Sequence, residues 1–262
     1  MIRVLTTILL AIGVLAGIWY LPLIGFQLVI LTAIGLGLSE YAKLVFQDNK
    51  TRVFTILLGL GLASLVTWSQ SPELILLGII GAVFASFVWE MSHLEPLPEA
   101  AHRVALIVLA VCYLALPLPF WGHIKAAGRE WVMLLLFPAC LTDTFGFLVG
   151  KSIGRRKLAP TISPNKTWEG FFGGLLGGGI FGTWLAYTLF FDGRAVNWTA
   201  LFAVGLSVSI VSALGDLIES LIKRSVGVKD SSHLIPGHGG ALDRLDALTF
   251  VAPLFYFLRH FI

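Results

Sequence analysis

The apolar runs of this chain constrain its fold more than any other feature. They alternate with short polar segments along the whole sequence, and 57% of the 262 residues are apolar. A helix of about 20 residues crosses the hydrocarbon core of a membrane, and a mean hydropathy of +0.88 is too high for a soluble globular domain. The sequence therefore predicts an all-α, polytopic membrane protein with about nine transmembrane helices. The predicted spans are 4–20, 23–39, 53–69, 73–90, 104–121, 130–150, 170–191, 200–222 and 247–262.

Lysine and arginine predict the orientation of these spans, because cytoplasmic loops of membrane proteins are enriched in both residues. With the N-terminus in the cytoplasm, 14 of the 18 basic residues fall in cytoplasmic segments. The four outside are Lys125, Arg129, Arg194 and Arg259. We therefore expect a multi-pass protein of the cell inner (cytoplasmic) membrane, with its C-terminus outside. The two charged loops, 151–169 and 223–246, then face the cytoplasm, where nucleotides are available.

The densest polar segment, residues 220–246, lies directly beside predicted spans, where charge is costly unless it has a function. Asp243 and Asp246 are three residues apart and share a helix face, which suits Mg²⁺ bound by carboxylates and substrate phosphates. Gly239 and Gly240 let backbone N–H groups approach an anion. Cations that can neutralise phosphate oxygens are Lys223, Arg224, Lys229 and Arg244. The combination indicates phosphoryl or nucleotidyl transfer.

A second polar segment, residues 158–170, precedes the seventh predicted span. Its two prolines favour an extended backbone. Ser163, Lys166 and Thr167 then offer two hydroxyls and an ammonium group to phosphates. Ser163 or Thr167 could instead cap the seventh helix, with Glu169 completing a capping box. Capping does not require a lysine, so we expect Lys166 to contact phosphate. The roles of the two hydroxyls stay open.

Two further acids lie inside predicted spans, where an ionisable side chain is a functional candidate by default. Asp143 lies near the end of the sixth span, and its alternative role is an interfacial cap. Asp216, Glu219 and Lys223 share one face at the end of the eighth span. Glu219 and Lys223 can form an ion pair four residues apart, whereas Asp216 has no such partner on its own helix.

Other polar and small residues have structural interpretations. Glu40 and Glu90 lie at span ends, and we interpret them as interfacial side chains. Glycines recur at a spacing of four in the seventh span, which predicts close packing against a neighbouring helix. These glycines are Gly173, Gly174, Gly177, Gly178 and Gly182.

The two polar segments resemble the signature sequences of phosphatidate cytidylyltransferases, also called CDP-diacylglycerol synthases. The matching residues read S-x-x-K-R-x4-K-D-x-S-x3-P-G-H-G-G-x-x-D-R-x-D over 220–246 and L-A-P-x-I-S-P-x-K-T-x-E-G over 158–170. The resemblance implies transfer of the cytidylyl group of CTP to phosphatidic acid, giving CDP-diacylglycerol and pyrophosphate in phospholipid biosynthesis. It implies Mg²⁺ as cofactor, with a second cation left open, and a homodimer; no nucleic-acid partner is expected.

The resemblance also implies roles for individual residues. Residues 1–128 are then the first five hydrophobic spans, and residues 129–262 are a transmembrane catalytic region. The implied metal ligands are Asp143, Asp216, Asp243 and Asp246, and the implied catalytic residues are Asp216, Asp243, Asp246, Lys223 and Arg224. The implied substrate-binding residues are Ser163, Lys166, Thr167, Lys229, His238, Gly239, Gly240 and Arg244. Two alternatives remain, a CTP-dependent lipid kinase of the polyprenol type and a membrane transporter.

Overall fold

The computed structural model describes residues 2–69, 71–92, 97–191, 195–232, 234 and 239–262, with the backbone alone for residues 2–8. The described chain is almost entirely helical. Its helices are α1 (Ile2–Tyr20), α2 (Leu23–Val45), α3 (Asn49–Trp68), α4 (Pro72–Met91), η1 (Leu97–Glu99), α5 (Ala100–Ala110), η2 (Val111–Ala115), α6 (Phe120–Ala127), α7 (Arg129–Ile153), α8 (Trp168–Gly174), η3 (Leu175–Gly182), α9 (Thr183–Phe190), α10 (Trp198–Ser225), α11 (Leu242–Thr249), α12 (Val251–Leu258) and η4 (Arg259–Phe261). The two strands are β1 (Lys157–Ala159) and β2 (Ser163–Thr167).

Six helical runs in the described part of the chain are long and apolar enough to cross a membrane. They are Leu23–Val45, Asn49–Trp68, Pro72–Met91, Leu97–Ala127, Arg129–Ile153 and Trp198–Ser225. A shorter apolar helix covers Leu9–Tyr20. The prediction of an all-α membrane protein is therefore confirmed.

The loop predicted at 151–169 contains a small β-hairpin, which the sequence did not predict. Strands β1 and β2 pair antiparallel, with Lys157 opposite Thr167 and Ala159 opposite Ser163. The extended backbone expected from the prolines is present, because β2 contains Pro164. A proline is tolerated in this strand because a two-stranded sheet has only edge strands. Strand β2 places Lys166 two residues before the first residue of α8.

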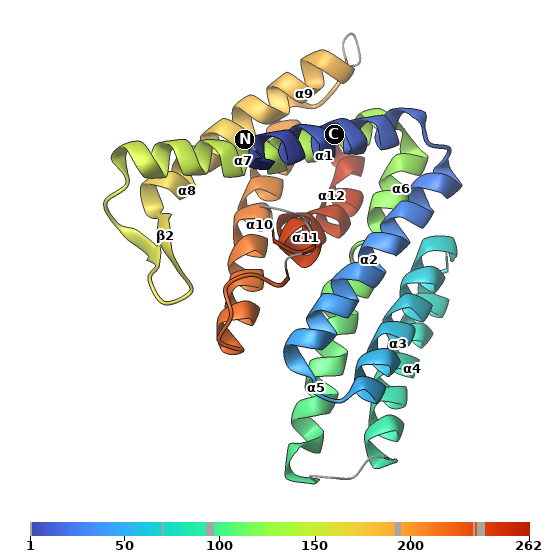
Figure 1. Ribbon diagram of the computed structural model, residues 1–262. Coiled ribbons are helices and arrows are strands. Elements are labelled where there is room, and N and C mark those ends of the chain that lie inside the picture. Colours follow the sequence, from blue (N-terminus) through green and yellow to red (C-terminus); the bar gives the residue numbers. More distant parts are fainter. Residues whose placement is uncertain (1, 70, 93–96, 192–194, 233, 235–238) are drawn as a thin grey trace.

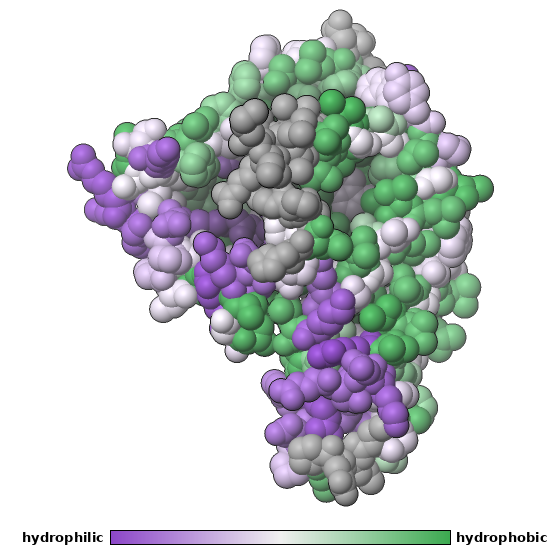
Figure 2. Space-filling model, in the orientation of Figure 1, coloured by the Kyte–Doolittle hydropathy of each residue, from purple (hydrophilic) through white to green (hydrophobic). Residues whose placement is uncertain are grey.

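The helices form two groups on either side of α10 and α11 (Figure 1). On one side lie α8, α9 and the hairpin, on the other lie α2, α3, α4 and α5, and α7 runs across from the end of α6 to the hairpin. Figure 2 shows hydrophilic side chains gathered on the side of the hairpin and at the lower end of the view, with hydrophobic side chains over much of the remaining face. This distribution separates polar loops from an apolar surface that suits a bilayer.

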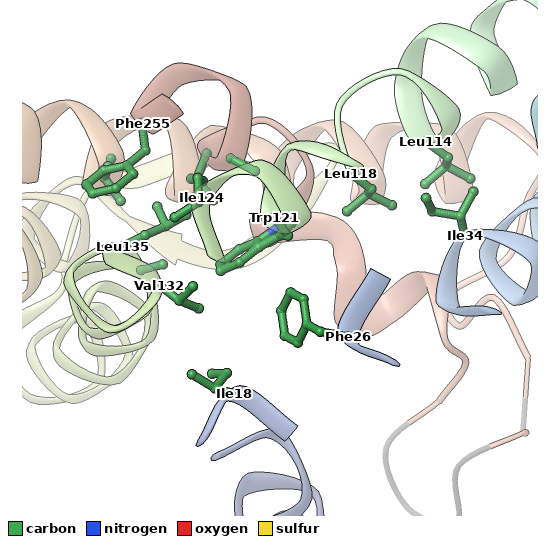
Figure 3. Close-up of a cluster of buried hydrophobic side chains, with 14 of the residues drawn as sticks. Ile18, Phe26, Ile34, Leu114, Leu118, Trp121, Ile124, Val132, Leu135 and Phe255 are labelled. Atoms are coloured by element: carbon green, nitrogen blue, oxygen red, sulfur yellow. The ribbon is translucent and has the colours of Figure 1, made fainter. Parts of the chain in front are cut away.

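One buried hydrophobic cluster joins the first half of the chain to the second (Figure 3). It includes Phe26 and Trp121 from the first half and Leu135 and Phe255 from the second. The indole N–H of Trp121 donates to the backbone oxygen of Leu248 at 3.1 Å, which satisfies the polar atom of this buried ring. The two halves therefore pack as one unit.

The glycine-rich seventh span packs closely against α7, as its spacing predicts. A Cβ atom at Gly178 of η3 would overlap the Thr142 hydroxyl and would lie 2.5 Å from the backbone oxygen of Pro138. Only glycine allows the two backbones to approach this closely. Because Thr142 precedes Asp143, this contact fixes the part of α7 that carries the membrane-embedded acid.

Candidate active site

A cavity of about 970 Å³ opens between α7, the β2–α8 junction, α10 and α11. It is lined by residues of both signature segments, 158–170 and 220–246, and by the two acids inside predicted spans, Asp143 and Asp216. The residues implied by the resemblance that line it are Asp143, Lys166, Thr167, Asp216, Lys223, Gly239, Asp243, Arg244 and Asp246. The fold thus brings together polar residues that are far apart in the sequence.

Three acids reach the cavity from three different helices. Asp143 comes from α7, Asp216 from α10 and Asp246 from α11. The close approach of α10 and α11 depends on Gly215, because a Cβ atom there would lie 2.6 Å from the backbone oxygen of Asp246. Burial, and then the negative charge of Asp216, raise the pKa of Asp246 to about 7. The negative charge of Asp143 acts on Asp246 in the same direction, so the three carboxylates repel one another across the cavity.

Lys166 bridges the hairpin and α10. Its ammonium nitrogen lies 2.7 Å from Oδ2 of Asp216 and donates to the backbone oxygen of Ala213 at 3.2 Å. The expected phosphate-contacting lysine therefore lines the cavity and is paired with one of its acids. A phosphate group entering the cavity would compete with Asp216 for this ammonium group.

Lys223 and Asp243 form the second charged pair of the cavity. The Lys223 ammonium lies 2.5 Å from Oδ1 of Asp243 and 2.5 Å from Oε2 of Glu219, so the predicted Glu219–Lys223 pair is confirmed. The other oxygen of Asp243 accepts hydrogen bonds from the backbone N–H groups of Ser231 and Gly240, at 3.1 and 2.7 Å, and from the Ser231 hydroxyl at 2.8 Å. Although burial acts in the opposite direction, the hydrogen bonds from Lys223 and Gly240 lower the pKa of Asp243 to about 2.

The two described glycines before α11, Gly239 and Gly240, lie against a carboxylate of the protein itself. Gly239 has a φ of +79°, a conformation that favours glycine, and the next N–H group points at Asp243. The sequence predicts that these N–H groups approach an anion, and here that anion is Asp243. His238 lies outside the described residues.

Four of the implied site residues that the structure describes do not line the cavity. Ser163 lies in β2, and Lys229 is exposed. The guanidinium group of Arg224 donates to the backbone oxygen of Ile162 at 3.4 Å and to that of Val228 at 3.5 Å, so it holds the hairpin loop near the end of α10. Gly240 is buried next to the cavity.

The predicted capping box at α8 is only half present. The Thr167 hydroxyl accepts a hydrogen bond from the backbone N–H of Gly170 at 3.1 Å and caps the helix. Glu169 does not complete the box. Its carboxylate accepts hydrogen bonds from the backbone N–H groups of Arg155 and Arg156, at 3.0 and 3.2 Å, because the hairpin brings that segment over the start of α8.

The interfacial interpretation of Glu40 and Glu90 is wrong. The two residues are only 4% and 3% exposed. The Glu90 carboxylate pairs with Arg103 at 2.8 Å. Glu40 contacts the start of α11 and the segment before it, directly behind the cavity. In the sequence each residue is visible only as an acid at the end of an apolar run. The partners of Glu40 could not be found from the sequence, because they lie 191 to 202 residues further along the chain.

A sequence profile described as the cytidylyltransferase family matches residues 1–262. The chain belongs to this family. Among curated proteins, it is 41% identical over 150 residues to a phosphatidate cytidylyltransferase of Staphylococcus aureus (strain COL). It is 40% identical over 150 residues to the protein of that name from Staphylococcus haemolyticus and 39% identical to one from Staphylococcus epidermidis. These matches cover 57% of this chain and 56% of each relative, so the chain spans just over half the length of the relatives it matches.

The acids in the cavity of this cytidylyltransferase-family protein offer oxygen ligands, which Mg²⁺ prefers. Among the residues that the structure describes, no three His, Cys, Asp or Glu side chains stand close enough to hold a metal ion by themselves. Mg²⁺ does not need such a cage, because it keeps several waters and is bound through one or two carboxylates plus substrate phosphates. Asp143, Asp216 and Asp246 line the cavity with carboxylate oxygens of that kind.

Proposed function

We propose that the protein transfers the cytidylyl group of CTP to phosphatidate, forming CDP-diacylglycerol and releasing pyrophosphate. The observation that carries the proposal is a polar cavity lined by acids and lysines that adjoins an apolar cavity at Arg244. Membership of the cytidylyltransferase family and the names of the bacterial relatives support the same reaction.

The apolar cavity supports a lipid as the acceptor. It has a volume of about 620 Å³ and is lined by α1, α2, α6, α7 and α11, with side chains such as Val14, Phe26 and Leu248. Arg244 lines both cavities. A phosphate next to this guanidinium group could therefore keep its acyl chain among apolar side chains while its oxygens face the polar cavity. A soluble acceptor would have no use for the second cavity.

The proposed reaction needs no protein nucleophile. An oxygen of the phosphatidate phosphate attacks the α-phosphorus of CTP, a new P–O bond forms, and the bond from the α-phosphorus to the bridging oxygen of pyrophosphate breaks. In this proposal Lys166, Lys223 and Arg244 bind the phosphates and offset the charge that develops on their oxygens. One or two of Asp143, Asp216 and Asp246 would hold Mg²⁺ together with substrate phosphates, and the ion would neutralise phosphate charge. In this proposal Asp243 orients Lys223 rather than binding the ion, because Oδ1 accepts from the Lys223 ammonium and Oδ2 already faces three donors from Ser231 and Gly240.

Membrane topology is part of the same proposal. The distribution of basic residues supports nine spans, a cytoplasmic N-terminus and a C-terminus outside, and six of the predicted spans coincide with helical runs of the described chain that are long and apolar enough to cross a membrane. The proposal includes the inner membrane as the location, where phosphatidate and CTP meet at the cytoplasmic face. It also includes a homodimer, which rests on the resemblance alone.

The test uses the purified chain in detergent with Mg²⁺, phosphatidate and CTP labelled at the α-phosphate. We expect label in the lipid and equimolar pyrophosphate. A parallel reaction with γ-labelled CTP should leave the lipid unlabelled. Label from the γ-position in the lipid, with release of CDP, would instead assign the lipid-kinase alternative, and CTP left intact with every lipid tested would overturn the proposal.

A further inference from the structure

Glu40 of α2 does not line the cavity, but it contacts the start of α11 and the segment before it, which carry residues that do. Its carboxylate lies within hydrogen-bond distance of four donors from residues close to Asp243. Oε1 accepts from the Ser232 hydroxyl at 2.6 Å and the Ala241 backbone N–H at 3.0 Å. Oε2 accepts from the Ser231 hydroxyl at 2.9 Å and the Leu242 backbone N–H at 2.8 Å.

Two of these donors belong to the start of α11, the helix that carries Asp243 and Asp246. The first N–H groups of a helix have no partner within the helix and need an acceptor from elsewhere. The N-cap residue of α11 is Ala241, whose side chain has no acceptor. Glu40 therefore provides from another helix the acceptor that a Ser or Asp at the N-cap would provide locally. Its negative charge also suits the positive end of the helix dipole.

The Ser231 hydroxyl links Glu40 to Asp243, which lines the cavity. Its oxygen lies 2.9 Å from Glu40 and 2.8 Å from Asp243, and Asp243 in turn holds Lys223. A hydroxyl has one hydrogen and can donate to one carboxylate at a time. The space between Gly240, Ser231 and Glu40 is filled, because a Cβ atom at Gly240 would overlap both the Ser231 hydroxyl and the Glu40 carboxylate.

In the described part of the chain, the hydrogen bonds of the Glu40 carboxylate all come from the 231–242 segment and none from α2. Glu40 is 4% exposed, and within the described residues it has no ion-pair partner, so its burial carries a desolvation cost that only the hydrogen bonds to the 231–242 segment offset. By contrast, the equally buried Glu90 is paired with Arg103. A costly buried charge whose contacts all lie on the segment behind the site is expected where geometry matters for function.

We propose that Glu40 is a positioning residue for cytidylyl transfer, which fixes the start of α11 so that Arg244 and Asp246 face the acids of α7 and α10. The inference rests on the proposed function. It gives the second span a role in the reaction and extends the functional region beyond residues 129–262.

The test compares Glu40→Gln with Glu90→Gln, a matched loss of a buried carboxylate away from the cavity. The glutamine amide cannot accept from all four donors, because one of its two ends is itself a donor. We expect kcat of folded Glu40→Gln to fall on the order of 10- to 100-fold, since small misplacements of reacting groups have effects of that size. KM for CTP and phosphatidate should stay within about 2-fold, because Glu40 does not line the cavity. Glu90→Gln should lower thermal stability and leave kcat per folded molecule unchanged.

Hydrogen exchange of residues 239–249 gives a second readout that does not depend on turnover. These amides should exchange faster in Glu40→Gln than in the wild-type chain or in Glu90→Gln. If Glu40→Gln fails to fold, Ser232→Ala removes one donor to the same carboxylate and should give a smaller change in both readouts. Unchanged exchange, or unchanged kcat in a chain whose wild type transfers label, would overturn the inference. Faster exchange together with a wild type that transfers no label would reject the proposed reaction and retain the contact.

Discussion

The ammonium nitrogen of Lys166 lies 2.7 Å from Oδ2 of Asp216, so a residue of β2 neutralises an acid of α10 across the cavity. Both side chains are partly exposed, at 25% and 32%, so substrate phosphates and a metal ion can reach either of them. An ion pair this accessible contributes little to stability. We expect it to open during the reaction, with Lys166 moving to phosphate and Asp216 to Mg²⁺.

Asp216→Asn should remove most of the activity. The variant keeps the shape of the side chain and loses its charge in a site that works by electrostatic stabilisation, so we expect kcat to fall about 100-fold or more. Steady-state transfer of labelled CTP to phosphatidate measures the change. Asp48→Asn is the control, because Asp48 caps α3 through the Thr51 N–H at 2.7 Å and asparagine caps a helix equally well. Equal activity of Asp216→Asn and wild type would remove Asp216 from the mechanism.

Filling the apolar cavity should discriminate between long and short lipids. Gly13 lines this cavity and has no heavy atom within 4 Å of an added Cβ, so Gly13→Phe would occupy the space without backbone strain. We expect kcat/KM for dioleoyl phosphatidate to fall about 10-fold, the equivalent of losing contact with a few methylene groups. The value for dioctanoyl phosphatidate should change less than about 2-fold.

Gly81→Phe is the matched control for the cavity variant. Gly81 of α4 also has open space around an added Cβ and does not line the cavity. Its kinetics with both lipids should equal those of the wild type. Equal losses on long and short lipids in Gly13→Phe, or a long-chain loss in Gly81→Phe, would contradict an acyl-chain site there.

Acid should release the hairpin from α8. Hydrogen bonds from the Arg155 N–H lower the pKa of Glu169 below its ordinary value of 4.5. A lowered pKa in the folded state means that the contact stabilises the hairpin above about pH 4.5 and is lost as the pH falls through the folded-state pKa. A spin label at Thr161→Cys, with Cys112 and Cys140 replaced by serine, should become more mobile over that acidic range. In Glu169→Gln the label should be mobile at neutral pH already, and a pH-independent signal in both chains would refute the anchor.

Gly178→Ala should destabilise the fold. The added methyl group would overlap Thr142 and crowd Pro138, and overpacking of this kind costs about 1–3 kcal/mol. The midpoint of thermal unfolding in detergent should fall by several degrees. Gly61→Ala, on an open face of α3, should leave the midpoint unchanged or raise it, because alanine is favoured over glycine by about 1 kcal/mol in a helix. Equal midpoints for the two variants would show that the close contact at η3 is unimportant.

The sequence by itself determined the class of protein and the chemistry of its cavity. Apolar runs of span length allow only a membrane-embedded helical chain, because backbone polar groups in lipid must be satisfied within helices. The two signature segments identified the family and named Lys166, Lys223, Asp243, Arg244 and Asp246, whereas Asp143 and Asp216 stood out as acids inside apolar runs. These are local properties, readable from residue type and spacing.

Only the tertiary structure decided which of these residues meet. Nothing in an apolar run says which helix will pack against which, so the meeting of Asp143, Asp216 and Asp246 depends on close contacts such as that at Gly215. The same packing gave Asp243 a set of donors inside the protein and turned Lys166 toward Asp216. It also brought Glu40 to the start of α11. A buried carboxylate must find its hydrogen-bond donors wherever the fold brings them, and in this chain they lie at the far end of the sequence.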